Sequence, residues 1–114
     1  MEDSQQPQDT MAMVGTLLVR TIDSQTMARA RPLFTGQLGH GVRIVGASSD
    51  DAMERDLKES RWDAVLLHPA YCRAIGSERL HEVRGLVSEL QGPECRVVDT
   101  VDDKELLPML KGLF

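Results

Sequence analysis

Several polar side chains stand at or just after the points where short apolar runs of this chain end. They are Arg20, Asp23, His68, Asp99 and Asp102. If each run is a strand of a parallel sheet, these side chains meet at the carboxyl edge, where open sheets place their ligand crevices. Arg20 could bind a phosphate there, and the carboxylates could hold a metal ion. His68 is the best single candidate, because it would end a central strand.

Each of these side chains also has a purely structural interpretation. His68, followed by Pro69, could be a partly buried histidine that hydrogen-bonds to a loop carbonyl. Arg20 could pair with one of the acids, because no glycine-rich loop surrounds it to complete a phosphate cradle. Asp23 and Asp99 fit helix-cap and turn positions equally well. We therefore assign no catalytic group and no metal site, and we expect no cofactor.

Four short β-favouring runs predict the sheet that would position these residues. They are TLLV (16–19), VRIV (42–45), AVLL (64–67) and RVVD (96–99). Polar or turn residues and then a helix-like segment follow each run, which favours a parallel sheet with right-handed crossovers. We predict a flavodoxin-like α/β fold, a three-layer sandwich whose sheet has the strand order 2-1-3-4 and helices on both faces. Residues 14–114 would form this single domain, and residues 1–13, which lack apolar periodicity, a disordered tail.

The helical segments differ in how clearly the sequence marks them. An apolar stripe marks the clearest helix, at Leu80, Val83, Val87 and Leu90. A helix before it begins near Ser49 or Asp50 and runs to about residue 61. The first helix begins near Ser24 and buries Leu33 or Phe34, but Pro32 predicts a kink or a late start. The last begins at residues 102–103 and contains Pro108.

Charge and composition exclude several classes of partner. The chain carries 18 acidic and 13 basic residues, a net charge of -5, which disfavours binding to nucleic acid. No apolar run approaches the roughly 20 residues that cross a bilayer, so we expect a soluble, cytoplasmic protein with no membrane partner. Cys72 and Cys95 lack the spacing of a zinc site and are expected to be reduced.

Two apolar regions are candidates for contact with a protein partner or a second copy. Tyr71 and Cys72 follow the third predicted strand in what we expect to be a loop. Val97 and Val98 lie in the fourth strand, whose outer edge has no predicted neighbour, and Phe114 is the last residue of the chain. Self-pairing at this edge is one expectation. The alternative is that Arg96 and the acids at 99–103 protect the edge and leave a monomer.

Two stretches resemble the receiver domain of response regulators. They are VRIVGASSDDAMERDLKESRWDAVLLHPAY, from Val42 to Tyr71, and CRVVDTVDDKELLPMLKGL, from Cys95 to Leu113. Receivers hold magnesium with acids after the first strand, where this chain has Arg20 and Thr21. They accept phosphate on an aspartate that ends the third strand, where this chain has His68. The family's switch hydroxyl falls near Asp99 or Thr100. The resemblance thus implies a degenerate, shortened receiver that has lost phosphotransfer.

The stretch VLLHPAYCR, residues 65–73, is also similar to the third strand of the IIB subunits of lactose- and cellobiose-type sugar phosphotransferase systems. That family carries a phosphorylated cysteine at the end of its first strand, where this chain has Arg20. Phosphotransfer would therefore need another acceptor, such as His68 or Cys72. Our preferred hypothesis is a non-catalytic receiver-like signalling module that works by protein-protein contact. The alternative is a IIB-like phosphotransfer protein with an unusual acceptor.

Overall fold

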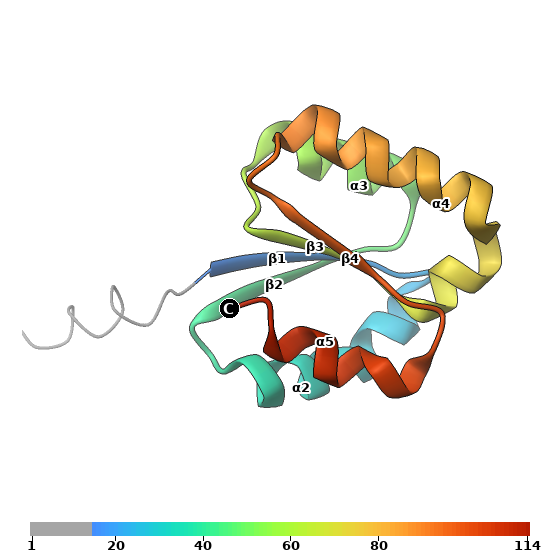
Figure 1. Cartoon of the computed structure of the whole chain (residues 1–114). Helices are drawn as coiled ribbons and strands as arrows, with labels where there is room; N and C mark the ends of the chain where they lie inside the picture. Colours follow the sequence, from blue (N-terminus) through green and yellow to red (C-terminus); the bar gives the residue numbers. More distant parts are fainter. Residues whose placement is uncertain (1–14) are drawn as a thin grey trace, which may run out of the picture.

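The computed structural model describes residues 15–114, which form a three-layer α/β sandwich (Figure 1). Its strands are β1 (Gly15–Arg20), β2 (Val42–Ala47), β3 (Ala64–Leu67) and β4 (Arg96–Asp99). Its helices are α2 (Ser24–Leu38), α3 (Asp50–Glu59), α4 (Pro69–Gln91), α5 (Leu106–Lys111) and the short 3-10 helix η1 (Asp103–Glu105). The predicted tail, residues 1–13, lies outside the described residues.

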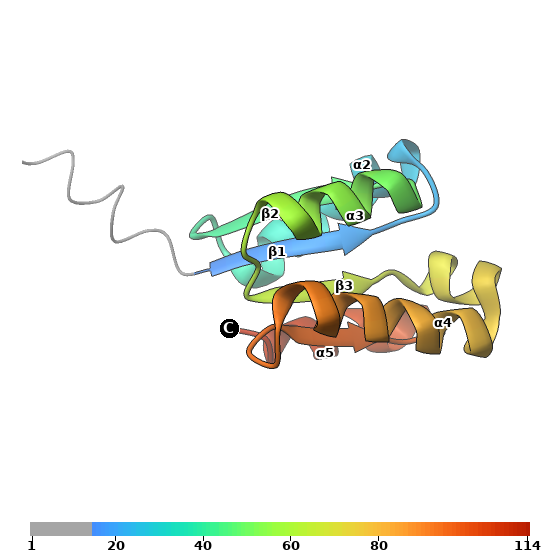
Figure 2. The same ribbon diagram turned by 90° about the horizontal axis from the view of Figure 1, so that it is seen from above.

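The four strands form one parallel sheet in the order β2-β1-β3-β4. This confirms the predicted flavodoxin-like class and strand order. The third and fourth strands have the predicted bounds, and the first two are longer by two residues each. Figure 2 shows α3 and α4 together on one face of the sheet. The helices α2 and α5 lie on the other.

Each face of the sheet has its own apolar core. Leu17 and Val19 of β1 pack with α2 and α5, whereas Leu18 packs with α3 and α4. All three side chains are fully buried. Successive strand residues point to opposite faces, so a strand covered on both sides must be apolar at every position. This explains why the predicted strands are continuous apolar runs.

Helix α2 is continuous from Ser24 to Leu38 and contains Pro32, so the expected late start is wrong. The Asp23 carboxylate caps its first turn by accepting a hydrogen bond from the backbone N–H of Thr26 at 2.7 Å. Pro32 is exposed, while Phe34 is fully buried against the sheet. The cap and this burial offset the hydrogen bond that a proline inside a helix removes. Of the two open alternatives for the buried position, Phe34 is correct.

Helix α4 begins at Pro69, earlier than the sequence indicated, and is bent at Gly76. Proline is favoured in the first turn of a helix, because its missing N–H needs no partner there. Gly76 has a φ of 82°, a conformation that favours glycine and separates the first two turns from the predicted apolar stripe. Within residues 15–114, no helix combines the length and the apolar character that crossing a membrane requires.

Candidate functional site

The strand-end residues predicted as one site lie on two opposite faces of the sheet. Arg20 is aligned with Leu67 in the β1–β3 register, and the backbone N–H of His68 donates to the Arg20 carbonyl at 3.0 Å. Because His68 is one residue beyond the aligned position, the pleat turns its side chain to the face opposite Arg20. The Arg20 side chain points toward α3 and α4, while His68 lines a groove beside α2 and α5.

On the α3/α4 face, Arg20 belongs to a polar cluster with Asp50, Tyr71 and Arg79, here called the arginine cluster. Arg20 Nη2 lies 2.8 Å from Asp50 Oδ1, and its guanidinium carbon lies 4.2 Å from the centre of the Tyr71 ring. The Tyr71 hydroxyl and Arg79 also donate to the Asp50 carboxylate, at 3.2 and 3.4 Å. The salt bridge expected of Arg20 thus exists, but its partner is Asp50 and not one of the strand-end acids.

Burial and charge set the protonation of the arginine cluster. The hydrogen bond from Arg20 lowers the pKa of Asp50 below its ordinary value. Burial, reinforced by the Asp50 charge, raises the pKa of Tyr71. Only Arg20 Nε is buried without a hydrogen-bond partner among the described residues. The two terminal nitrogens of Arg20 are thus engaged, Nη2 by Asp50 and Nη1 by the Thr21 carbonyl, and only Nε is left without a partner within residues 15–114.

On the other face, His68 acts as the N-cap of α4. Its Nδ1 accepts a hydrogen bond from the backbone N–H of Ala70 at 3.1 Å, so the proton of the neutral ring is on Nε2. Burial lowers the pKa of His68. His68 is only 8% exposed, so it is more deeply buried than expected, and its partner is a backbone N–H instead of the expected loop carbonyl. Sequence reasoning missed this cap because histidine is not among the preferred N-cap residues.

The other strand-end residues have separate local partners. Asp23 caps α2, and Asp99 forms an ion pair with Arg84 of α4. The Thr100 hydroxyl donates to Glu105 at 3.2 Å. In the described part of the chain, no three His, Cys, Asp or Glu side chains are arranged to hold a metal ion.

The candidate interaction residues are also separated. Tyr71 and Cys72 are each only 2% exposed and lie in α4, so their predicted place on a surface loop is wrong. The Cys72 Sγ donates to the Leu67 carbonyl at 3.3 Å, and burial raises the pKa of its thiol. Phe114 is exposed, but a Cβ on Gly15 would collide with its ring, which places it against the start of β1. Val97 and Val98 are half-buried on β4.

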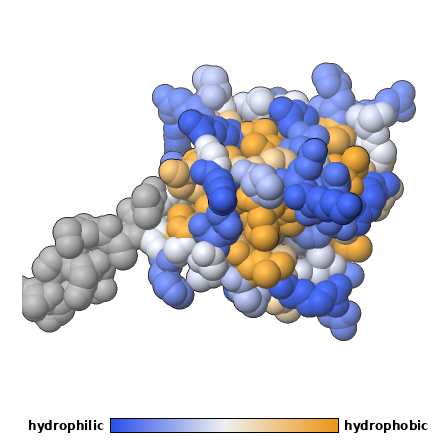
Figure 3. All heavy atoms as spheres, turned by 60° about the horizontal axis from the view of Figure 1, so that its bottom comes forward, coloured by the Kyte–Doolittle hydropathy of each residue, from blue (hydrophilic) through white to orange (hydrophobic). Residues whose placement is uncertain are grey.

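A groove opens at the carboxyl edge of the sheet between α2, α5 and the start of α4, here called the α2–α5 groove. Its volume is about 440 Å³. The lining residues are Ile22, Thr26, Arg29, Ala30, Leu33, His68, Ala70, Arg73, Asp103, Leu106 and Leu107. Ile22, just before α2, and Leu33, in its third turn, both line the groove and are 44% and 56% exposed. Figure 3 shows apolar side chains surrounded by polar ones on the face that carries these two helices.

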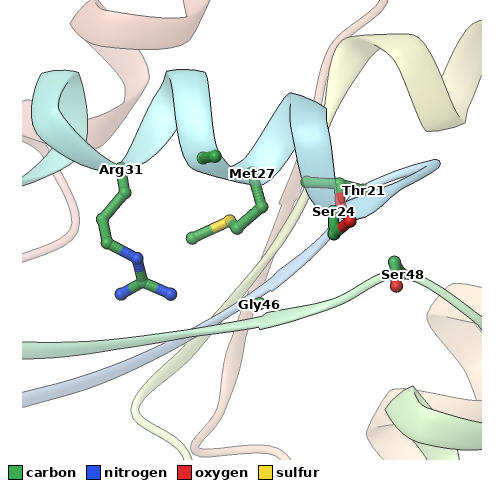
Figure 4. Close-up of a pocket in the computed structure, with 7 residues that line it drawn as sticks. Thr21, Ser24, Met27, Arg31, Gly46 and Ser48 are labelled. Carbon is green, nitrogen blue, oxygen red and sulfur yellow. The ribbon is translucent and has the colours of Figure 1, made fainter.

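A second cavity, of about 290 Å³, lies between α2 and the edge strand β2 (Figure 4). Arg31 extends from α2 toward β2 and donates to the Ile44 carbonyl at 2.6 Å. Met27 lies over Gly46, where a Cβ would collide with its side chain. This cavity therefore results from α2 packing over the edge of β2. Its one cationic side chain, Arg31, is already bonded to the Ile44 carbonyl.

Of the residues that line the α2–α5 groove, only His68 was predicted as part of a site. Leu33 was read as a candidate core position, and Ile22 was not singled out. The sequence offered only a weak signal, because Leu33 and Phe34 are adjacent in one amphipathic helix and the rotation of that helix against the sheet decides which of them is buried.

Comparisons with family models, with curated proteins and with solved structures find no match for this chain.

Proposed function

We propose that this domain is a receiver-like regulatory module without catalytic activity, which binds another protein at the α2–α5 groove. The exposure of Ile22 and Leu33 around a hollow at the carboxyl edge is the observation that carries this proposal. Exposed apolar side chains with a polar rim are typical of protein interaction sites. We place the module in the cytoplasm, where the free thiols of Cys72 and Cys95 would stay reduced.

The groove also indicates the chemistry of its partner. Leu33, Leu106 and Leu107 give it an apolar wall. Arg29 and Arg73 place two cations beside one carboxylate, that of Asp103, which lies 3.4 Å from Arg73. The lining residues therefore carry one net positive charge, on Arg29, although the chain is acidic. A short apolar segment that carries an acidic side chain, such as one face of a helix, has the matching chemistry.

The residues at the possible phosphate-acceptor positions favour a binding function over phosphotransfer. Arg20, which stands at the acceptor position of the IIB family, is held by Asp50 and Tyr71. His68 already uses Nδ1 as a helix cap. The buried Cys72 thiol has a raised pKa, so its nucleophilic thiolate is disfavoured. Each candidate acceptor thus has a structural role that phosphorylation would disrupt.

A phosphorylation assay tests the non-catalytic part of the proposal. The protein is incubated with acetyl phosphate and magnesium, and separately with the general proteins of a sugar phosphotransferase system. Mass spectrometry of the intact chain should detect no added phosphate. Calorimetry should show no saturating magnesium binding at millimolar ion, because magnesium prefers oxygen ligands and Arg20 and His68 stand where a receiver has acids. Stable phosphate on His68 or Cys72 would support the IIB-like alternative instead.

Site-specific crosslinking tests the groove. A photoreactive amino acid at Leu33 should capture a partner, and the same group at Ala28, exposed on the other side of α2, should not. With the purified partner, Leu33→Asp should weaken binding at least tenfold, roughly the loss of one apolar anchor. Ala28→Asp should change the dissociation constant by less than about twofold. Equal effects of the two substitutions would contradict binding at the groove.

A further inference from the structure

The outer edge of β4 presents backbone groups that no other strand within residues 15–114 pairs. The N–H of Arg96 donates to the Asp63 carbonyl at 3.1 Å, so Arg96 and Val98 direct their peptide groups toward β3. Because these groups alternate along a strand, those of Val97 and Asp99 point outward. Figure 1 shows β4 at the front of the sheet, between α4 and α5.

The opposite edge of the sheet is occupied at one position by a side chain. On β2, the Ala47 carbonyl accepts a hydrogen bond from the backbone N–H of Thr21, the residue after β1, so by alternation the Ile44 carbonyl points outward. Arg31 occupies that carbonyl from α2. Pairing of β4 with β4 of a second copy would cover the β4 edges of both sheets and leave outermost their β2 edges, which Arg31 crosses. This favours a closed two-fold dimer over an open fibre.

We propose that β4 pairs antiparallel with β4 of a second copy, about a two-fold axis at Val98, so that two sheets join into one. Val97 packs against the core on the α3/α4 face and Val98 against the core on the α2/α5 face. Both are half-buried, so each can bury more surface, and β-branched residues suit a strand. This inference is independent of the α2–α5 groove and its partner.

The alternation of the backbone selects this register. In an antiparallel pair, residues that face each other either both direct their peptide groups at the partner strand or both direct them away. With Val98 on the axis, Val97 of each copy faces Asp99 of the other, and each of these pairs exchanges two N–H···O bonds. An axis at Val97 or at Asp99 would leave only one such pair within β4.

Charge complementarity favours a second copy as the occupant of this edge. In the proposed register, Arg96 faces Thr100 of the second copy, and the Thr100 hydroxyl bonds to Glu105. Arg96 Nη1 donates to the Gly112 carbonyl of its own chain at 2.8 Å. The remaining N–H groups of this guanidinium are available to the carboxylate of Glu105 from the other chain, and the two-fold axis repeats the contact. Opposite charges that face each other across strands stabilise the pairing.

Disulfide trapping tests the register. Cys95→Ser removes the half-buried native thiol, and Cys72 remains buried. Val98 on the axis forms a non-hydrogen-bonded pair, with Cα atoms roughly 4.5 Å apart, so Val98→Cys should crosslink two chains under mild oxidation. Val97→Cys is the matched control and should crosslink at least about tenfold more slowly, because each Val97 faces Asp99. Equal rates would overturn the register.

A charge swap measured by sedimentation tests the dimer itself. Arg96→Glu should raise the dissociation constant of the dimer about tenfold or more, since two attractive contacts become repulsive. Adding Glu105→Arg should restore it, and Arg43→Glu on the β2 edge should leave it unchanged. The proposal is overturned by a monomer at several hundred micromolar of the unsubstituted chain. It is also overturned by a dimer that Arg96→Glu does not weaken or that the double variant does not restore.

Discussion

The two faces of the sheet differ most at its carboxyl edge, where sequence patterns placed a single site. On the α3/α4 face, the arginine cluster ties a charged strand end to two helices through Asp50 and Tyr71. On the α2/α5 face, the groove leaves Ile22 and Leu33 exposed around His68. The charged and polar side chains of the arginine cluster are bonded to one another, whereas the groove exposes large apolar side chains.

A reactive or charged side chain is not necessarily free to bind a ligand. A charged group near the end of a buried strand must find a partner, because leaving a buried charge unpaired is costly. Arg20 finds that partner in Asp50, so its chemistry serves stability. Leu33 has no such requirement and stays at the surface, where it can serve binding. Substitutions on the two faces should therefore affect stability very differently.

The largest effect is expected at Arg20. Arg20→Ala removes the buried partner of Asp50 and the contact with Tyr71, and should lower the free energy of unfolding by about 2 to 3 kcal/mol in urea titrations. The estimate lies below the usual range for a buried pair because the Asp50 side chain is 52% exposed. Arg79→Ala is the matched control, since Arg79 bonds the same carboxylate from a half-exposed position, and should cost less than about 0.5 kcal/mol. Similar losses in both variants would refute the distinction.

A smaller effect is expected at His68. His68→Ala removes the side-chain cap of α4 and should lower the free energy of unfolding by about 1 kcal/mol. His68→Asn supplies another N-cap acceptor and should recover most of that loss. Thermal unfolding followed by circular dichroism measures both. If Asn restores nothing, the cap is not the main contribution of this side chain.

The pH dependence of stability should follow His68. Burial lowers its pKa in the folded state below the ordinary 6.5, so the unfolded chain binds a proton first as the pH falls. The stability due to the neutral ring is complete above pH 6.5 and is lost as the pH falls through the folded-state pKa. Urea titrations across this range should show a decline that His68→Asn lacks. An identical decline in both proteins would assign the titration to other groups.

The smallest effect on stability is expected in the groove. Leu33→Asp replaces a side chain that is 56% exposed, so the free energy of unfolding should change by less than about 0.5 kcal/mol. Phe34→Ala, one residue away and fully buried, should cost about 3 kcal/mol or more. A large loss from Leu33→Asp would show that this position belongs to the core.

The sequence was sufficient to predict the architecture. The strand runs 64–67 and 96–99 have the bounds that their apolar pattern predicted, and Ser49 caps α3 as expected. Such features depend on local composition and periodicity, which the sequence contains directly. The errors lie where a single residue changed the local outcome. Pro69 began a helix where a loop was expected, and Pro32 was accommodated within α2.

The candidate site could not be assembled in the same way. Alternation along neighbouring strands sends Arg20 and His68 to opposite faces, although their backbones are hydrogen-bonded. The partner of Arg20 lies 30 residues away in the sequence, at the start of α3, and nothing local links the two. By itself the sequence thus determined the layers, the strand order and the apolar core, because burial and periodicity are properties of short segments. Only the tertiary structure decided which charges are paired and which leucine is exposed, because these depend on contacts between distant segments.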